Sequence, residues 1–119
     1  MFFEMGGMFT LLPHVTELAP GGQTAPHRHL REELIHVLSG RGYTRIWQKG
    51  GPEVKLEWAE GDLFSPPLNA WHEHVNLDSS APARYYSVEN VILERLFENQ
   101  EFVNNNDFVF RDRFNGQHG

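Results

Sequence analysis

The sequence of 119 residues contains no cysteine. Disulfides, thiolate metal sites, iron–sulfur clusters and thiol nucleophiles are therefore excluded, and the redox state of the compartment stays open. The chain also lacks a run of lysine or arginine. It contains 10 basic and 16 acidic residues, so its formal net charge is −6. Nucleic acid and anionic membrane surfaces repel such a chain, so neither is expected as a partner. A glycine-rich phosphate loop and a nucleophile elbow are missing as well.

Long hydrophobic runs are also absent. Residues 1–8 include Glu4 and two glycines and have no basic start, so the sequence predicts neither a signal peptide nor a membrane span. We therefore expect a soluble, cytoplasmic protein. A chain of this length has room for one core, and no low-complexity linker divides it. This indicates a single domain over residues 1–119.

Short stretches of alternating apolar and polar residues, separated by glycine and proline, make up most of the chain. This pattern predicts the strands of an all-β domain. Turn signals recur about every ten residues, which is typical of a sandwich or a barrel. Residues 97–119 break the pattern, and we expect them to form a C-terminal extension. The predicted strands are 15–18, 33–38, 43–48, 54–58, 63–64, 72–77 and 84–96, of which the last is one bent strand or two.

Two histidine pairs stand out, His27 with His29 and His72 with His74. Side chains at positions i and i+2 of a strand share a face, so the members of each pair can project together. Glu33 opens the next predicted strand at the edge of an apolar interior, where a carboxylate needs a partner. A transition-metal ion bound by His27, His29, Glu33 and His72 would supply that partner.

The glycines, prolines and asparagines around these residues form two longer motifs. They read Gly21-x5-His27-x-His29-x3-Glu33-x6-Gly40 and Gly61-x5-Pro67-x-Asn69-x2-His72-x3-Asn76. These motifs resemble the two motifs of the cupin family, the first at every specified position and the second at all but one. The exception is Asn69, where the family usually has glycine. Asparagine tolerates the left-handed backbone conformation that such a turn requires.

The resemblance implies an antiparallel β-barrel of the jelly-roll type that is often dimeric. It also implies a metal held by His27, His29, Glu33 and His72. Iron, manganese, nickel, cobalt, copper and zinc all occur in the family. Four protein ligands leave two positions on an octahedral ion, whereas they fill a tetrahedral zinc. We therefore expect iron(II) ahead of manganese, nickel and zinc.

Several residues near the motifs leave alternatives open. Glu32 could take the place of Glu33, although the spacing to Gly40 favours Glu33. His74 could be an alternative ligand, a group that supports the ligands, a proton donor or an ordinary buried polar residue. Trp71 could line the pocket or belong to the core.

The remaining polar candidates have simpler expectations. Arg28, Arg31 and Arg45 could bind a substrate carboxylate, but each is expected on the solvated surface. His36 lies on the opposite strand face from Glu33 and is expected to pack. His14 and His118 carry no functional signal.

The segment Trp71-His72-Glu73-His74 looks like the Trp-His-Asp-His segment of gentisate-type ring-cleaving dioxygenases. Those enzymes usually lack the glutamate of the first motif and are longer chains of two barrels. The resemblance implies a dioxygenase-like oxidoreductase that acts on a small aromatic or oxo acid, with His74 or Glu73 moving protons. Two alternatives stay open. One is a non-catalytic module, or one barrel of a longer bicupin, that binds or senses a small ligand; the other is a metal-dependent isomerase or epimerase.

The phenylalanines near the C-terminus bear on the oligomeric state. Five of them lie between Phe97 and Phe114 and have no obvious surface of their own to cover. Open sheet edges also favour association. We therefore predict a two-fold homodimer in which these side chains cover the neighbouring barrel.

Overall fold

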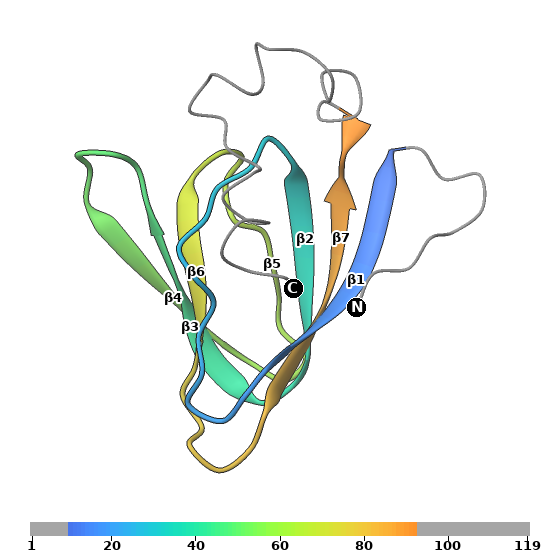
Figure 1. The fold of residues 1–119 in the computed structure, drawn as a ribbon, viewed down its shortest axis with the longest axis vertical. Coiled ribbons are helices and arrows are strands. Elements are labelled where there is room, and N and C mark those ends of the chain that lie inside the picture. Colours follow the sequence, from blue (N-terminus) through green and yellow to red (C-terminus); the bar gives the residue numbers. More distant parts are fainter. Residues whose placement is uncertain (1–9, 93–119) are drawn as a thin grey trace.

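The computed structural model describes residues 10–92, and seven strands lie within them. They are β1 (Leu11–Leu18), β2 (Glu32–Ser39), β3 (Arg41–Trp47), β4 (Glu53–Ala59), β5 (Leu63–Phe64), β6 (Trp71–Asn76) and β7 (Ala83–Asn90). All pairings are antiparallel and form two sheets, with the strand orders β1-β7-β2-β5 and β4-β3-β6. The sheets face each other as the two walls of a barrel (Figure 1). The predicted all-β jelly-roll architecture is confirmed.

The segment between β1 and β2 holds the first histidine pair outside any regular strand. It runs beside β6 before it crosses to β2 (Figure 1). Isolated bridges join Gln23 to Val75 and His27 to His72. This coil therefore carries the first motif along the strand that carries the second one.

The barrel interior is apolar at one end and polar at the other. Burial alternates along β2, so that Glu33, Ile35 and Val37 face inward while the residues between them face outward. The core cluster at the apolar end consists of Leu18, Ile35, Val37, Trp58, Ala83 and Tyr85. Glu33 stands at the start of β2 and lies beyond this cluster, at the polar end. The Glu33 carboxylate thus lies at the edge of the apolar interior, as the sequence predicted.

Two turns use left-handed backbone conformations that the motifs require. Asn69 has a φ of 58°, so asparagine does adopt the conformation in which the family usually has glycine. Gly40 has a φ of 90° between β2 and β3, and a side chain there would also approach the backbone of Ala83. Both turns fix where the adjacent strands begin.

Strand bounds differ from the predicted ones by at most four residues where they can be compared, and β5 has the predicted bounds. The largest difference is at β1, which begins at Leu11 rather than at Val15 because Leu11 to His14 continue the pairing with β7. The predicted strand 84–96 is described as β7 up to Asn90, and residues 93–96 lie outside the described part. The predicted extension 97–119 and its phenylalanines also lie outside it. Among residues 10–92, no helix is long and apolar enough to span a bilayer.

Candidate metal centre

Three histidines from the two motifs meet at the polar end of the barrel. His27 and His72 exchange both backbone hydrogen bonds, at 3.0 and 2.9 Å, which brings their rings to a centroid separation of 4.3 Å. The ring of His29 lies 5.1 Å from that of His72. One candidate ligand atom from each of the three residues lies within 4.8 Å of the other two. The structure therefore brings these three predicted ligands together.

The outer nitrogens of the three rings are bound to backbone carbonyls. The Nδ1 atoms of His27, His29 and His72 lie 2.8, 3.2 and 2.9 Å from the carbonyl oxygens of Ala25, Arg31 and Ala70. A carbonyl oxygen can only accept, so each Nδ1 carries the hydrogen and each Nε2 has its lone pair available. This is the tautomer that a metal-binding imidazole needs, and its ring orientation is set before any ion binds.

Glu33 joins the three histidines through one carboxylate oxygen. Its Oε1 lies 3.5 Å from Nε2 of His29 and 3.8 Å from Nε2 of His72. Its other oxygen, Oε2, accepts a hydrogen bond of 2.5 Å from the hydroxyl of Ser87 on β7. Ser87 thereby turns Oε1 toward the histidines. The neighbouring Glu32 is exposed on the outer face, so it does not reach the cluster.

The geometry of the four residues fits a divalent transition metal. Ligand atoms that surround one ion at about 2.1 Å lie roughly 3 to 3.5 Å apart. The distances of 3.5 and 3.8 Å from Glu33 Oε1 need to shorten by only a few tenths of an ångström. Three imidazole nitrogens and one carboxylate oxygen are donors that iron, manganese, nickel and zinc accept. The side chains are only 1 to 4% exposed, so the site is enclosed.

Burial keeps the imidazoles of His27 and His29 neutral. Loss of hydration, together with the neighbouring His72 and His74, lowers the pKa of His27 to about 2. Burial likewise lowers the pKa of His29 to about 4, although the Glu33 carboxylate partly offsets this effect. Neutral imidazole is the metal-binding form, so protons compete weakly for these two residues at neutral pH.

His74 and Glu73, the two predicted proton carriers, lie on opposite faces of β6. His74 faces inward, with its ring centroid 5.5 Å from that of His72. Glu73 faces the other side of the sheet and forms an ion pair with Arg45. The structure does not bring Glu73 to the metal centre, because adjacent residues of a strand point in opposite directions. Hydrogen bonding to Glu73 instead raises the pKa of Arg45.

A stack of aromatic and cationic side chains covers the outer face beside Glu73. Trp71 and Trp47 are stacked, with ring centroids 6.4 Å apart and planes inclined by 10°. The guanidinium of Arg28 lies 4.9 Å from the Trp71 ring, and that of Arg45 lies 5.7 Å from the Trp47 ring. Trp71 is therefore half-buried on the outer face of β6 and does not belong to the apolar core cluster. Because Arg28 lies between the candidate ligands His27 and His29 in sequence, its cation–π contact connects their loop to β6.

A second buried polar group beside Glu33 was not expected from the sequence. Glu89 lies directly opposite Glu33 across β7 and β2, an arrangement in which two carboxylates repel. Arg31 forms an ion pair with Glu89, and Nδ1 of His14 lies 3.6 Å from Glu89 Oε1. The expectation of a solvated Arg31 was wrong, because its partner lies on a strand distant in sequence. Ser87 and Glu89 lie on the same inward face of β7 as Tyr85. This alternation along the strand was the only sequence signal that the two polar residues are buried.

Comparison with known proteins agrees with this geometry. The model of the cupin domain family matches residues 14–89. The chain is 39% identical over 64 residues to a 5-aminosalicylate 1,2-dioxygenase from a Comamonas species and 35% identical over 46 residues to an acireductone dioxygenase from Branchiostoma floridae. The matches cover 54% and 39% of this chain, but only 16% and 26% of those relatives.

Solved structures share the fold at low sequence identity. Oxalate oxidase in complex with glycolate superposes with a TM-score of 0.62 at 22% identity, over 68% of this chain and 42% of that one. The cupin domain of Schizosaccharomyces pombe Cnp3 superposes with a TM-score of 0.64 at 12% identity, over 82% and 69% of the two chains. With two motifs, the barrel topology and the family match in agreement, the chain belongs to the cupin family.

Proposed function

We propose that this protein is a metal-dependent, dioxygenase-like oxidoreductase that acts on a small organic substrate. The observation that carries the proposal is that His27, His29 and His72 bring ligand atoms within 4.8 Å of one another. Glu33 Oε1 lies beside them, 3.5 and 3.8 Å from Nε2 of His29 and of His72. Four protein ligands leave two positions on an octahedral ion for exogenous ligands. Iron(II) is the proposed metal, ahead of manganese and nickel. Zinc in a tetrahedral site would be filled by the same four residues.

The relatives support a substrate that contains adjacent oxygen atoms. The two relatives above bear the names of dioxygenases, one for an aminosalicylate and one for an acireductone. We extend this to the present chain as a preference for a small aromatic hydroxy acid or an oxo acid. In a dioxygenase reaction both atoms of dioxygen enter the product, so the substrate supplies the electrons and no separate reductant is needed.

The side chains at this centre have different proposed roles. A bound iron(II) ion would supply the redox-active Lewis acid that brings substrate and dioxygen together. His27, His29, Glu33 and His72 would hold that ion, while Ser87 keeps Glu33 turned toward it. His74 faces the same space and is the proposed group for proton transfer. Glu73 is not retained in that role because it faces Arg45.

Oxygen uptake tests the proposal directly. Metal-free full-length protein is loaded with iron(II) under argon, and oxygen consumption is followed with 5-aminosalicylate, gentisate, catechol and a 1,3-diketone. We expect uptake with at least one of these compounds that exceeds uptake with free iron(II). Uptake no faster than with free iron(II) for every compound would contradict the proposal. A compound that raises the melting temperature and is recovered unchanged would instead support a binding or sensing module.

Variants of adjacent residues make the test specific. His74→Gln removes the inward proton carrier, and Glu73→Gln changes the next residue on the outward face. Loss of one general acid or base typically costs about 100-fold or more in rate. We expect that loss for His74→Gln and a change within about threefold for Glu73→Gln, both with iron retained. Equal losses in the two variants would argue against His74 as the proton carrier.

The proposed assembly is a homodimer with a small molecule as its other partner. Support comes from the outer face of β2 and β5, where Leu34, Leu38 and Leu63 are 48, 43 and 62% exposed. Beside them lies a largely apolar groove of about 420 Å³ that also includes Tyr86 and Val88. Exposed apolar patches of this kind are typical of association surfaces. The cytoplasmic location stays a prediction from the sequence.

A further inference from the structure

Arg31 lies inside the barrel between two of the candidate metal ligands. His29, Arg31 and Glu33 are 2, 2 and 4% exposed, whereas Leu30 and Glu32 between them are less buried. A guanidinium in this place is costly, because a buried charge needs a partner and a nearby metal ion would repel it. Arg31 therefore depends on a negative group close by.

Glu89 on β7 is that negative group. Nη1 of Arg31 forms an ion pair with Glu89 Oε2, and Nδ1 of His14 on β1 lies 3.6 Å from Glu89 Oε1. Glu89 also lies directly opposite Glu33 in the pairing of β7 with β2. Two carboxylates in this arrangement repel each other, and the Arg31 guanidinium offsets the repulsion. The ion pair as a whole adds no net charge to the metal centre.

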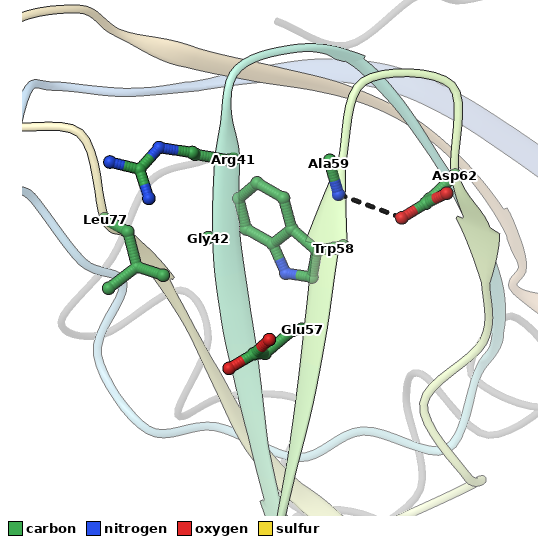
Figure 2. A pocket seen from close by; sticks show the side chains of 7 residues that line it. All are labelled: Arg41, Gly42, Glu57, Trp58, Ala59, Asp62 and Leu77. Atoms are coloured by element: carbon green, nitrogen blue, oxygen red, sulfur yellow. Dashed lines mark hydrogen bonds between the residues drawn. The ribbon is translucent and has the colours of Figure 1, made fainter.

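Burial distinguishes this ion pair from the charged side chains near the apolar end of the barrel. Figure 2 shows Arg41, Glu57 and Asp62 around a cleft of about 390 Å³. These three residues are exposed, so water solvates their charges. Arg31 and Glu89, by contrast, are 2 and 0% exposed. A buried ion pair stabilises a fold no better than apolar residues of the same volume, which favours a role in positioning.

The backbone of Arg31 sets the orientation of His29. The Arg31 carbonyl oxygen accepts a hydrogen bond from Nδ1 of His29 at 3.2 Å. Arg31 lies one residue before β2, so the pairing of β2 with β7 does not include it. The ion pair with Glu89 instead anchors this residue to β7 through its side chain. The position of the carbonyl, and with it the direction of the His29 ring, therefore depends on the ion pair.

We propose that the buried Arg31–Glu89 ion pair positions the two metal ligands on either side of Arg31. It holds the Arg31 carbonyl against His29, and it keeps Glu89 opposite Glu33 without repelling the carboxylate that faces the metal. Arg31 and Glu89 are positioning residues, since the guanidinium is buried and engaged with a carboxylate of the protein itself. The proposal rests on the proposed metal site and adds residues that support it.

A double substitution removes the ion pair without leaving a buried charge. Arg31→Met with Glu89→Leu replaces both charges by apolar side chains, an exchange that buried ion pairs often tolerate. It also leaves the net charge of the chain unchanged. The matched control, Arg84→Met with Glu17→Leu, makes the same exchanges in an ion pair between β7 and β1 whose side chains are both 53% exposed.

Zinc affinity is the first readout, measured on full-length protein by competition with a fluorescent chelator. Loss of a group that supports a metal ligand typically weakens binding about 10- to 100-fold. We expect a loss of about tenfold or more for Arg31→Met with Glu89→Leu, and a change within about threefold for the control. Wild-type affinity in the first double variant, or equal losses in both, overturns the proposal.

Nitrogen-15 NMR of the histidine rings is the second readout, and a general loss of stability would not reproduce its pattern. Nδ1 of His27 and of His72 donates to other carbonyls, so their signals should stay unchanged in Arg31→Met with Glu89→Leu. The Nδ1 signal of His29 should shift, and its hydrogen should exchange faster. An unchanged His29 signal, or equal shifts in all three rings, overturns the proposal.

The NMR comparison is made on both zinc-loaded and metal-free protein. The hydrogen bond of His29 to Arg31 does not require a metal, so failure of the proposed metal site or oxidation and failure of the positioning role are distinguishable. If the double variant does not fold, Glu89→Gln takes its place, since it keeps the shape and removes the charge that holds the guanidinium. An unchanged His29 signal in folded Glu89→Gln overturns the proposal equally.

Discussion

His27 and His72 lie opposite each other and exchange both of their backbone hydrogen bonds, although they belong to different motifs. Their side chains therefore share one face, and their rings come within 4.3 Å. Together with the hydrogen bonds from the Thr24 N–H to the His74 carbonyl and from the Asn76 N–H to the Gly22 carbonyl, this pair of bonds joins the irregular loop of the first motif to the strand of the second. The candidate metal centre depends on this junction, since neither motif contains all of the candidate ligands.

Metal binding should stabilise the fold. Ligands that bind only the folded state stabilise it by about 2.7 kcal/mol at a concentration 100-fold above Kd, or roughly 10 °C in melting temperature for a domain of this size. We expect the melting temperature to fall by the same amount when a chelator removes the metal, as measured by calorimetry. His72→Ala should show no stabilisation by added metal, whereas His36→Ala, on the exposed outer face, should behave as the wild type. Equal stabilisation of His72→Ala would contradict the assigned site.

The metal-free protein should lose stability as the pH falls from 6.5 toward 4. The pKa of His29 is lowered to about 4 by folding, so the unfolded chain binds a proton in this interval that the folded chain does not. The free energy of unfolding should fall by a few kcal/mol, and His27, with a pKa of about 2, extends the loss further. Urea unfolding at several pH values measures this. In His29→Asn the free energy of unfolding should fall less over this pH interval, because this variant lacks the titrating imidazole. An equal fall in the variant and the wild type would refute His29 as the cause.

Ser87 should matter for metal affinity although it does not contact the metal. Its hydroxyl donates to Glu33 Oε2, and loss of such an outer partner typically weakens metal binding about 10- to 100-fold. We expect this weakening for Ser87→Ala in a competition assay with a fluorescent chelator. Thr16→Val is the matched control, because Thr16 is buried on neighbouring β1 and its hydroxyl makes no hydrogen bond among residues 10–92. Equal affinities of Ser87→Ala and the wild type would remove Ser87 from the site.

Gly42 should tolerate no side chain. A Cβ atom there would overlap the carbonyl oxygen of Val75 and the Trp58 ring. We expect Gly42→Ala to lose several kcal/mol of stability or to be insoluble, because backbone and ring cannot both move away. Gly21→Ala is the comparison, since its φ of 65° is strained for alanine but nothing lies within 4 Å. That variant should lose only about 1 kcal/mol in urea unfolding, and the opposite order would contradict the packing around Trp58.

The exposed leucines should govern self-association. Light scattering of the wild type should give twice the monomer mass of 13.7 kDa. The double variant Leu34→Lys with Leu63→Lys should be monomeric, because charged residues are disfavoured in the core of an interface. Val54→Lys, on the other sheet and also exposed, is the control and should remain dimeric. A monomeric wild type would refute the dimer.

The sequence by itself determined the class of fold, and it predicted which residues meet at the candidate metal centre. Period-two alternation predicted the strands, and β5 was predicted with its bounds. Motif spacing identified the residues that meet, because glycine and asparagine turns set where each strand begins. Asn69 illustrates this, since it stands at a position where the second motif usually has glycine, and asparagine tolerates the left-handed conformation that the turn requires.

Only the tertiary structure decided how each ligand is held and what surrounds it. Glu73 and His74 are neighbours in sequence, yet one pairs with Arg45 and the other with Thr44. His14, which carried no signal, is fully buried beside Glu89. Such partners come from strands far apart in the chain, and the register between those strands is set by the packing of the whole barrel. Local sequence patterns therefore could not reveal which ring nitrogen of each imidazole carries the hydrogen.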